Sequence, residues 1–316
     1  MSARVVTVTL NPAIDQTVIL DALQLGAVNR ARSARVDAGG KGVNVASCLA
    51  DWGVATAVTG LLGRANASVF EALFDAKRID DRCLRLSGET RTNIKLVGKD
   101  GTTTDINLPG LNANAGDLIA VGRALGDLCA PGVLAVLSGS LPSGLPEDSY
   151  VELLKIVAAN EARAVLDTSG APLSTALAAP KSAMPYAVKP NRQELEAWAE
   201  RRLADTADLL AAAQELRALG IALVVVSLGT EGALFVSDAG ALLARAPVIE
   251  TSSTVGAGDA MVAGLSAALL DNADLETTAR LATAFAAAKL GLPGPNLPDR
   301  RRVNELAAAT KIRGIP

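Results

Sequence analysis

The chain has 316 residues, half of them hydrophobic, and a formal net charge of −3. That length suffices for one large α/β domain or two small ones, and the slightly acidic balance gives no general attraction to nucleic acid. The sequence contains no histidine, which excludes a Ser-His-Asp triad, a histidine-ligated zinc and a histidine general base. Any proton transfer therefore falls to other side chains, carboxylates above all.

The sequence shows no sign of a membrane or secretory segment. No apolar run approaches the length of a transmembrane span, and the first residues lead straight into a strand without a signal-peptide pattern. The three cysteines, Cys48, Cys83 and Cys129, are scattered without metal-binding spacing. These features predict a cytoplasmic protein whose thiols are small core residues.

Short β-rich runs alternate with Ala/Leu-rich helical stretches along most of the chain. Strands are predicted over Val5–Leu10, Ala55–Thr59, Val133–Ser138, Ala164–Asp167, Tyr186–Val188 and Leu223–Ser227. Helices are predicted over Val43–Asp51, Ala67–Ala76, Gly116–Cys129, Glu147–Ala159, Gln193–Arg201, Ala207–Leu219 and Val303–Thr310. The alternation predicts an α/β fold with a mostly parallel sheet between helices, and ligands in such folds bind beyond the carboxyl ends of the strands.

One region departs from this alternation. Thr90–Val97 alternates between polar and apolar residues, and Thr102–Leu108 follows after a three-residue loop, Lys99–Gly101. The spacing predicts a hairpin that pairs Lys95 with Asp105 and Asn93 with Asn107, with a polar, cationic face and an apolar face. We expect a lid whose polar face covers an anionic ligand and whose apolar face contacts a second subunit; the alternative is an ordinary edge hairpin packed on its own domain.

Three small-residue loops follow predicted strands on the ligand side of the sheet. In Asn11–Asp15, Asp15 can accept hydrogen bonds from sugar hydroxyls. The loop Ala38–Asn44 is rich in glycine and opens a helix, but it matches neither the P-loop nor the dinucleotide fingerprint. The third loop, Ser138–Gly144, is a weak signal by itself. Each of the three loops could instead be a simple turn.

Two further segments have both a structural and a functional interpretation. Asn191, with Glu194 three residues later, is typical of a helix capping box; alternatively, Glu194 organises a Mg²⁺ ion and its waters near a nucleotide phosphate. The segment Ser227–Gly232 is a glycine turn after a very apolar strand, and it either contacts a nucleotide or only turns the chain.

The segment Thr254–Asp259 carries the strongest chemical signal. A glycine-rich turn that opens a helix presents free backbone N–H groups at the positive end of the helix dipole and so favours phosphate. Asp259 would repel an anion there unless it accepts the proton of a hydroxyl that attacks the phosphate. The simpler interpretation is an acidic residue in the first turn of a buried helix.

In this order, these pieces resemble the PfkB/ribokinase family of sugar kinases over almost the whole chain. Its two signatures correspond to Gly39–Ala46 and Thr254–Asp259, and its N-x-x-E element corresponds to Asn191 and Glu194. The resemblance implies a single kinase domain over residues 1–316. Its core would be ribokinase-like and Rossmann-type, and a β-sheet lid would be formed by about residues 12–38 and 90–109. It also implies ATP and Mg²⁺ as cofactors and a homodimer formed through the lid, with no nucleic-acid or membrane partner.

The resemblance also implies roles for individual residues. Asp259 would be the catalytic base, and Gly256, Ala257 and Gly258 would form the anion hole. The phosphosugar would be bound by Asp15, Arg30, Gly39, Gly40, Lys41, Asn44, Arg91, Asn93, Lys95, Asn107 and Ser140. The nucleotide would be bound by Lys189, Asn191, Glu194, Ser227, Gly229 and Gly232, with Glu194 acting on Mg²⁺ indirectly.

Within the family, Thr9–Asp15 and Gly139–Pro142 look like the phosphosugar-kinase branch. Thr104–Asn107 and Val188–Glu196 look most like the enzymes of that branch that phosphorylate fructose 1-phosphate. That likeness implies transfer of the γ-phosphoryl group of ATP to the 6-hydroxyl of fructose 1-phosphate, giving fructose 1,6-bisphosphate. Tagatose 6-phosphate and fructose 6-phosphate are alternative substrates, because a phosphate at either end of a ketohexose needs similar cations. A remote alternative is a non-catalytic sugar-phosphate sensor, whose expected sign is a broken Gly-Ala-Gly-Asp loop or a missing N-x-x-E element; both are intact here.

Overall fold

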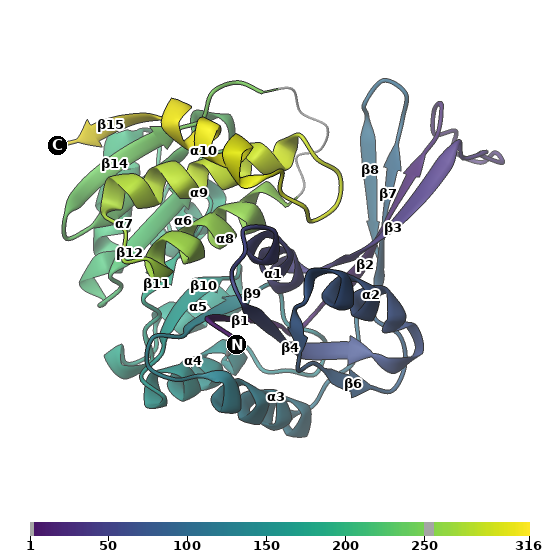
Figure 1. The fold of residues 1–316 in the computed structure, drawn as a ribbon, viewed down its shortest axis with the longest axis horizontal. Helices are drawn as coiled ribbons and strands as arrows, with labels where there is room; N and C mark the ends of the chain where they lie inside the picture. The colour runs from purple at the N-terminus through teal and green to yellow at the C-terminus, as the bar shows by residue number, and fades with distance from the viewer. Residues whose placement is uncertain (1–2, 250–255) are drawn as a thin grey trace.

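The fold is α/β and has two sheets of different size (Figure 1). The computed structural model describes residues 3–249 and 256–316. Within these ranges a central sheet of eleven strands lies between two layers of helices, and a four-stranded sheet projects from one end. The predicted class is therefore confirmed.

The central sheet is parallel in its middle and antiparallel at one edge. Its strands run in the order β15-β14-β13-β12-β11-β10-β9-β1-β4-β5, and β6 also pairs with β4. The parallel strands are β1 (Val5–Thr9), β4 (Thr56–Gly63), β5 (Asp80–Asp81), β6 (Leu84–Leu86), β9 (Leu134–Ser138), β10 (Arg163–Asp167), β11 (Ala187–Val188) and β12 (Leu223–Ser227). The antiparallel edge consists of β13 (Ala233–Ser237), β14 (Gly240–Arg245) and β15 (Lys311–Ile315).

The helices divide between the two faces of the central sheet. One face is covered by α3 (Ala115–Leu128), α4 (Ser149–Ala159), α5 (Ala171–Leu177), α6 (Arg192–Ala199) and α7 (Thr206–Ala218). The other face is covered by α1 (Lys41–Asp51), α2 (Ser68–Lys77), α8 (Ala257–Leu270), α9 (Leu275–Leu290) and α10 (Arg300–Ala309). Short 3₁₀ turns occur at Arg64–Asn66, Lys181–Ala183 and Gly229–Glu231.

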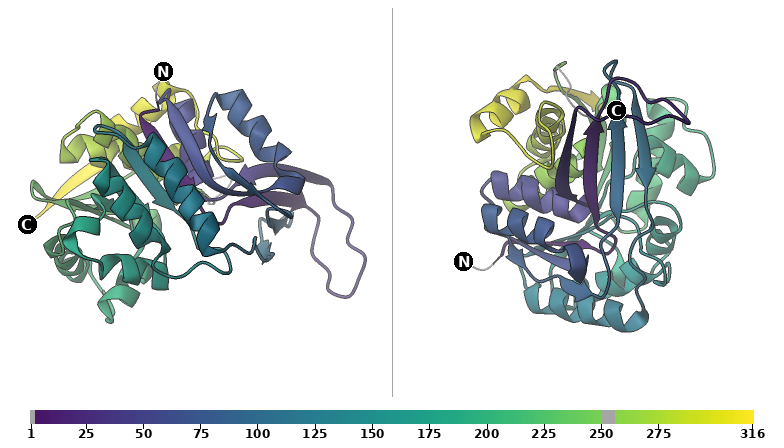
Figure 2. Two further views of the ribbon diagram at one scale, coloured as in Figure 1. Left: turned by 90° about the horizontal axis from the view of Figure 1, so that it is seen from below. Right: turned by 90° about the vertical axis from the view of Figure 1, so that its right-hand side faces the viewer.

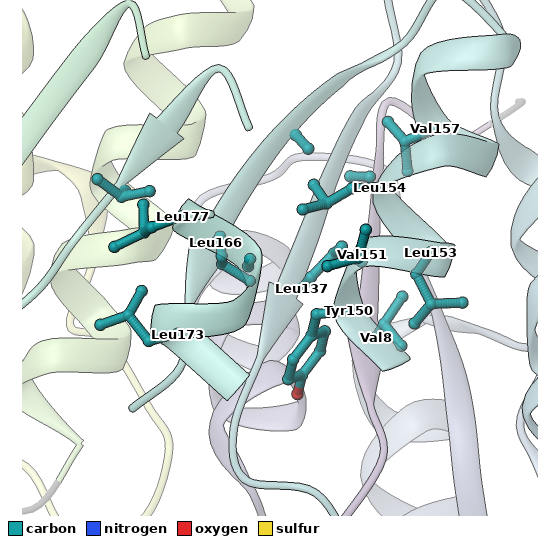
Figure 3. Packing of buried hydrophobic residues seen from close by; sticks show 14 of the residues in the cluster. Val8, Leu137, Tyr150, Val151, Leu153, Leu154, Val157, Leu166, Leu173 and Leu177 are labelled. Carbon is teal, nitrogen blue, oxygen red and sulfur yellow. The ribbon is translucent and has the colours of Figure 1, made fainter. Parts of the chain in front are cut away.

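Alternate residues of the buried strands belong to opposite cores. Val5 packs in the cluster that includes α1, α8 and α9, whereas Val6 and Val8 pack in the cluster with α3 and α4. Figure 3 shows Val8 and Leu137 packed against the buried side of α4. Because both faces are buried, these strands are continuously apolar, as the sequence predicted.

The second sheet has the order β3-β2-β7-β8, built from β3 (Ser33–Gly39), β2 (Ala13–Ile19), β7 (Thr92–Val97) and β8 (Thr103–Asn107). Figure 2 shows the four strands side by side at one end of the molecule. The predicted register is confirmed, since Lys95 lies opposite Asp105 and Asn93 lies opposite Asn107. The N–H of Gly98 donates to the carbonyl of Thr102 at 2.9 Å, which closes the predicted three-residue turn.

Several elements were not predicted. The antiparallel strands β13 and β14 are short apolar runs that follow glycine turns, and β15 is a short run of mixed polarity after the last helix. Helix α5 has only seven residues and helix α9 has an almost uniform alanine-rich surface, so neither shows a clear apolar stripe. The last helix starts at Arg300 rather than Val303, because Asp299 caps it by accepting from the N–H of Arg302 at 2.9 Å.

A search of the described helices found none with both the length and the apolar character needed to cross a membrane.

Candidate active site

The second sheet and the carboxyl edge of the central sheet enclose a cavity of about 240 Å³. Each of the four strands of the second sheet contributes two polar side chains to it, and the register places all eight on one face: Asp15, Thr17, Arg35, Asp37, Asn93, Lys95, Asp105 and Asn107. The core contributes Asn44 of α1, Gly256 at the start of α8, Lys289 at the end of α9, and Gly294 with Pro295. The cavity therefore lies between a polar sheet face and the ends of three helices.

Asp259 lies in the first turn of α8, directly behind this cavity. Gly256 caps the helix with a left-handed φ of 81°, a conformation that glycine adopts without steric strain. The Asp259 side chain is 7% exposed, and its Oδ2 accepts a hydrogen bond from Asn44 Nδ2 at 2.7 Å. Burial and the neighbouring Asp167 raise the pKa of Asp259 to about 6, against the opposing effects of Asn44, Lys41 and Lys189. A carboxylate with this pKa is ionised at neutral pH and can still take up a proton.

Two lysines flank a buried aspartate next to Asp259. Asp167, at the end of β10, lies 3.2 Å from Lys41 Nζ through its Oδ2 and 3.2 Å from Lys189 Nζ through its Oδ1. Burial acts to lower the pKa of Lys41, but the carboxylates of Asp167, Asp259 and Glu194 outweigh it and raise that pKa. The Lys41 ammonium group is thus held charged, and it lies with that of Lys189 beside the carboxyl edge of the sheet, where the two can attract phosphate.

The side chains on the polar face of the second sheet are linked to one another. Asn93 Nδ2 donates to Asp15 Oδ1 at 3.1 Å, and Arg35 Nε donates to Asp37 Oδ2 at 2.7 Å. Burial raises the pKa of Asp15, partly offset by the hydrogen bond from Asn93 and by the charges of Arg91 and Lys95. These contacts hold carboxylates, amides and cations ready for a polyhydroxylated, anionic ligand.

The predicted capping box at the start of α6 is present. The N–H of Asn191 donates to Glu194 Oε2 at 2.8 Å, and the N–H of Glu194 donates to Asn191 Oδ1 at 2.9 Å. Asn191 also bridges to Ser227 at the end of β12, and both Asn191 and Glu194 line a second hollow of about 250 Å³ beside Gly170. The structural interpretation of this motif is therefore confirmed, and the same geometry leaves Glu194 at the carboxyl edge of the sheet.

The loop after α9 is anchored to the neighbouring helices. Lys77 Nζ donates to Ser47 Oγ at 2.6 Å, to Asp51 Oδ2 at 2.7 Å and to Asn296 Oδ1 at 2.8 Å. The hydroxyl of Ser47 also donates to the carbonyl of Pro295. This network fixes the position of the loop residues that line the cavity.

The pattern that defines the pfkB family of carbohydrate kinases matches residues 8–301. The chain belongs to the PfkB family.

Relatives and solved structures of the family match along the full chain. The 1-phosphofructokinase of Xanthomonas campestris pv. campestris is 57% identical over 318 residues, which cover all of both chains. The 1-phosphofructokinase of Rhodobacter capsulatus is 47% identical and covers 100% of this chain and 99% of the relative. The structure of phosphofructokinase-2 from Escherichia coli in complex with fructose-6-phosphate superposes with a TM-score of 0.89 at 28% identity, covering 97% of this chain and 98% of the other. The core is thus ribokinase-like, as the sequence predicted.

In this PfkB kinase many of the predicted site residues come together. Asp15, Asn44, Asn93, Lys95, Asn107 and Gly256 line the cavity. Ala257 and Gly258 form the first turn of α8 with Asp259, and a Cβ on Gly258 would lie 3.7 Å from Lys189 Nζ. Thr254 and Val255, the first residues of the predicted anion-binding turn, lie outside the described residues.

Close packing explains why glycines, and not larger residues, occupy the two positions before α1. A Cβ on Gly39 would collide with the carboxylate of Asp15, and Gly40, with a φ of 106°, would place a Cβ 2.9 Å from Pro12 Cα. These two glycines therefore let the start of α1 approach β2 closely, and their role in substrate binding stays a prediction.

Six predicted phosphosugar ligands lie outside the cavity lining: Arg30, Gly39, Gly40, Lys41, Arg91 and Ser140. Arg30 is exposed on the segment between β2 and β3. The Arg91 guanidinium donates to the carbonyls of Pro12 and Asn11, both at 3.3 Å. Ser140 Oγ accepts from Asn11 Nδ2 at 3.1 Å and so belongs to the wall behind Arg91. Within this single chain, only Lys95 of the three predicted cations Arg30, Arg91 and Lys95 faces the cavity.

The two glycines that were predicted to bind the nucleotide, Gly229 and Gly232, differ in the space around them. A side chain on Gly229 would meet no atom within 4 Å, so the turn is open to a ligand, although its φ is 60°. A side chain on Gly232 would collide with the carbonyl of Ala244 on β14, so packing alone requires this glycine. No group of three or more carboxylate, histidine or cysteine side chains within the described ranges is arranged to bind a metal ion.

Four residues near the site were missed in the sequence. Arg35 and Asp37 lie on β3, which has no clear strand pattern in the sequence, and Lys289 lies in an alanine-rich helix whose end was not predicted. Asp167 was recognised only as the last residue of a strand. Its position at a carboxyl end, where ligands bind in parallel sheets, was a usable signal.

Proposed function

We propose that this PfkB kinase transfers the γ-phosphoryl group of ATP to the 6-hydroxyl of fructose 1-phosphate. The full-length similarity to two proteins named 1-phosphofructokinase carries this proposal. The cavity supports it, because a buried carboxylate beside a helix N-terminus lies at one end and cations of the second sheet lie at the other. A substrate with a hydroxyl to phosphorylate and a phosphate already in place suits such a two-ended site.

Asp259 is the proposed catalytic base. It accepts the proton of the attacking hydroxyl while the oxygen of that hydroxyl bonds to phosphorus and the bond to the leaving ADP oxygen breaks. The backbone N–H groups of Gly256, Ala257 and Gly258 stabilise negative charge on the transferring group. Asn44, which already donates to Asp259, orients the carboxylate.

The sugar hydroxyls are bound by Asp15, Asn44, Asn93 and Asn107 in this proposal. The existing phosphate is bound by Lys95, with Arg91 released from its backbone acceptors. Gly39, Gly40, Lys41 and Ser140 border these groups. Arg30 reaches a phosphosugar only if the second sheet of a partner subunit brings it there, because in its own chain it lies outside the cavity lining.

ATP and Mg²⁺ belong to the proposal as nucleotide and cofactor. Mg²⁺ keeps several waters and is bound through one or two carboxylates together with substrate phosphates, so a site without a cluster of protein ligands fits it. Glu194 would hold its waters, while Lys189, Asn191, Ser227, Gly229 and Gly232 would lie along the nucleotide. When bound, Mg²⁺ neutralises charge on the β- and γ-phosphate oxygens.

The second sheet serves as lid and dimer interface in this proposal. The face opposite the cavity carries Val36 at 49% exposure and Ile106 at 45% exposure. These large apolar side chains lie in one row across the sheet, on its two edge strands β3 and β8. A second copy of the sheet would cover this face. The unit is then one domain of residues 1–316 whose lid comes from residues 12–38 and 90–109, working in the cytoplasm where ATP and phosphosugars are available.

The test compares ADP release with fructose 1-phosphate, fructose 6-phosphate and tagatose 6-phosphate. The expected result is the highest kcat/KM for fructose 1-phosphate. A higher value for either 6-phosphate would assign the enzyme to that alternative. Binding of all three without ADP release would instead identify a sugar-phosphate sensor.

A further inference from the structure

The site contains a buried ammonium group to which the proposed mechanism gives no role. Lys289 lies in the last turn of α9, is 3% exposed and lines the cavity beside Gly256. Its Nζ donates to the carbonyl of Leu292 at 2.9 Å. A Cβ placed on Gly256 would lie 3.4 Å from Lys289 Cε, so the lysine packs directly against the start of α8.

Lys289 differs in its partners from the buried Lys189 and the half-buried Lys77. Lys189 lies 3.2 Å from the carboxylate of Asp167, and Lys77 lies 2.7 Å from that of Asp51. No carboxylate within residues 3–249 and 256–316 lies within 4.0 Å of Lys289 Nζ. Its hydrogen bond is to a neutral carbonyl at the end of its own helix, where the helix dipole favours a cation.

This arrangement is unfavourable for folding. Burial lowers the pKa of Lys289, and the charge of Arg35 lowers it further, while Cys48, Asp259 and Asp37 act in the opposite direction. A buried charge without an opposite charge in contact is destabilising, and an apolar side chain of similar length would avoid that penalty. A residue that weakens the fold and faces the reaction cavity indicates a functional role.

We propose that the ammonium group of Lys289 contacts the phosphoryl group in transfer and is a catalytic residue of this kinase. The proposal rests on the proposed function and adds a cation to the N–H groups of Gly256, Ala257 and Gly258. Negative charge on the transferring group would supply the opposite charge that Lys289 does not contact among the described residues. Lys289 remains protonated throughout, since the proton of the hydroxyl goes to Asp259.

The first test replaces Lys289 by methionine, which keeps the length of the side chain and removes its charge. We expect kcat to fall about 10²-fold with KM changes below about threefold, because the contact forms mainly in the transition state. We also expect the midpoint of thermal unfolding to stay the same or rise. Lys155→Met on the exposed side of α4 is the control and should change neither quantity. A drop in unfolding midpoint with unchanged kcat would show that Lys289 only caps α9.

If Lys289→Met lowers both kcat and the midpoint of thermal unfolding, a second variant distinguishes loss of the charge from loss of stability. Lys289→Ala leaves a cavity that a small cation can enter, so ammonium or potassium chloride should restore at least about tenfold of the lost kcat. Choline chloride at equal ionic strength should not. Absence of rescue by both small cations, together with lowered stability, would overturn the proposal.

A binding measurement keeps this proposal separate from the choice of sugar. If wild type turns over none of the three phosphosugars, the proposed function fails, but a contact with the γ-phosphoryl group still predicts tighter binding of ATP than of ADP. Titration calorimetry should show that Lys289→Met reduces the ratio of the two affinities about tenfold. An unchanged ratio in that case would refute the role of Lys289.

Discussion

The charged side chains at the two ends of the cavity differ in burial and in the partners that they contact. At the end formed by α8 and α9, Asp259 and Lys289 are almost fully buried and have neutral hydrogen-bond partners, Asn44 and the carbonyl of Leu292. On the second sheet, cations pair with carboxylates at half-buried or exposed positions, as in Lys95 with Asp105 at 2.8 Å. Burial raises the pKa of Asp259 and lowers that of Lys289 at the first end, whereas ion pairs hold the orientation of side chains on the second sheet. The first end is therefore suited to chemistry and the second to binding.

The largest expected effect comes from removing the buried carboxylate. Asp259→Asn should lower kcat roughly 10²–10⁴-fold while both substrates still bind, because the base is lost and the contacts remain. The variant should also unfold at higher temperature. The raised pKa of about 6 means that ionised Asp259 destabilises the fold above pH 6, and this penalty disappears as the pH falls through 6 toward 4. Near-normal turnover would remove Asp259 from the proposed mechanism.

The pH dependence of kcat/KM should distinguish the end of the cavity that contains Asp259 from the end formed by the second sheet. The proposed mechanism needs ionised Asp259, so kcat/KM should fall about tenfold per pH unit below pH 6 and be level above it. The phosphate of the phosphosugar also ionises near pH 6 and contributes to the same profile. That contribution is the same for all variants assayed with one substrate, so a difference in apparent pKa between variants comes from the enzyme.

Asn44→Ala removes the hydrogen bond that lowers the pKa of Asp259 and should move the acid limb of the profile to higher pH. Asn93→Ala, which removes a hydrogen bond to Asp15 on the second sheet, should leave the position of the limb unchanged. Equal shifts in both variants would mean that the limb does not report Asp259.

A smaller effect, on substrate binding, is expected at the end of the cavity formed by the second sheet. Arg91→Ala should raise the KM for the phosphosugar about tenfold and leave the KM for ATP within about twofold, because loss of one charge-assisted contact weakens binding of that substrate only. Steady-state kinetics with each substrate varied in turn measures both constants. If the two KM values rise equally, Arg91 supports the wall of the site and does not bind the phosphate.

The smallest effect on the chemistry is expected on the far face of the second sheet. Ile106→Asp should weaken the proposed dimer, since it places a charge on the exposed apolar face, while the cavity side chains keep their positions. Light scattering over a concentration series measures the association, and Thr103→Asp on the opposite face is the control. A wild-type chain that is monomeric throughout the series would eliminate the dimer proposal.

Much of the site could be predicted because its residues lie in segments that have a recognisable local sequence pattern. The hairpin of β7 and β8 has a strict polar and apolar alternation with a glycine turn, so its register was predictable to the residue. The glycine turn before Asp259 and the capping box at Asn191 are likewise local signals. The strand β3 and the end of α9 lack such signals, because charged and alanine-rich runs give no clear period.

The sequence alone determined the α/β alternation and the polar hairpin face, and it pointed to Asp259 as the proposed base in a chain without histidine. Only the tertiary structure decided which charges meet. It placed Asp167 between Lys41 and Lys189, kept Arg30 and Arg91 out of the cavity lining, and brought Lys289 against Gly256. The reason is physical: burial and pairing depend on contacts between residues far apart in the chain, and no local pattern encodes them.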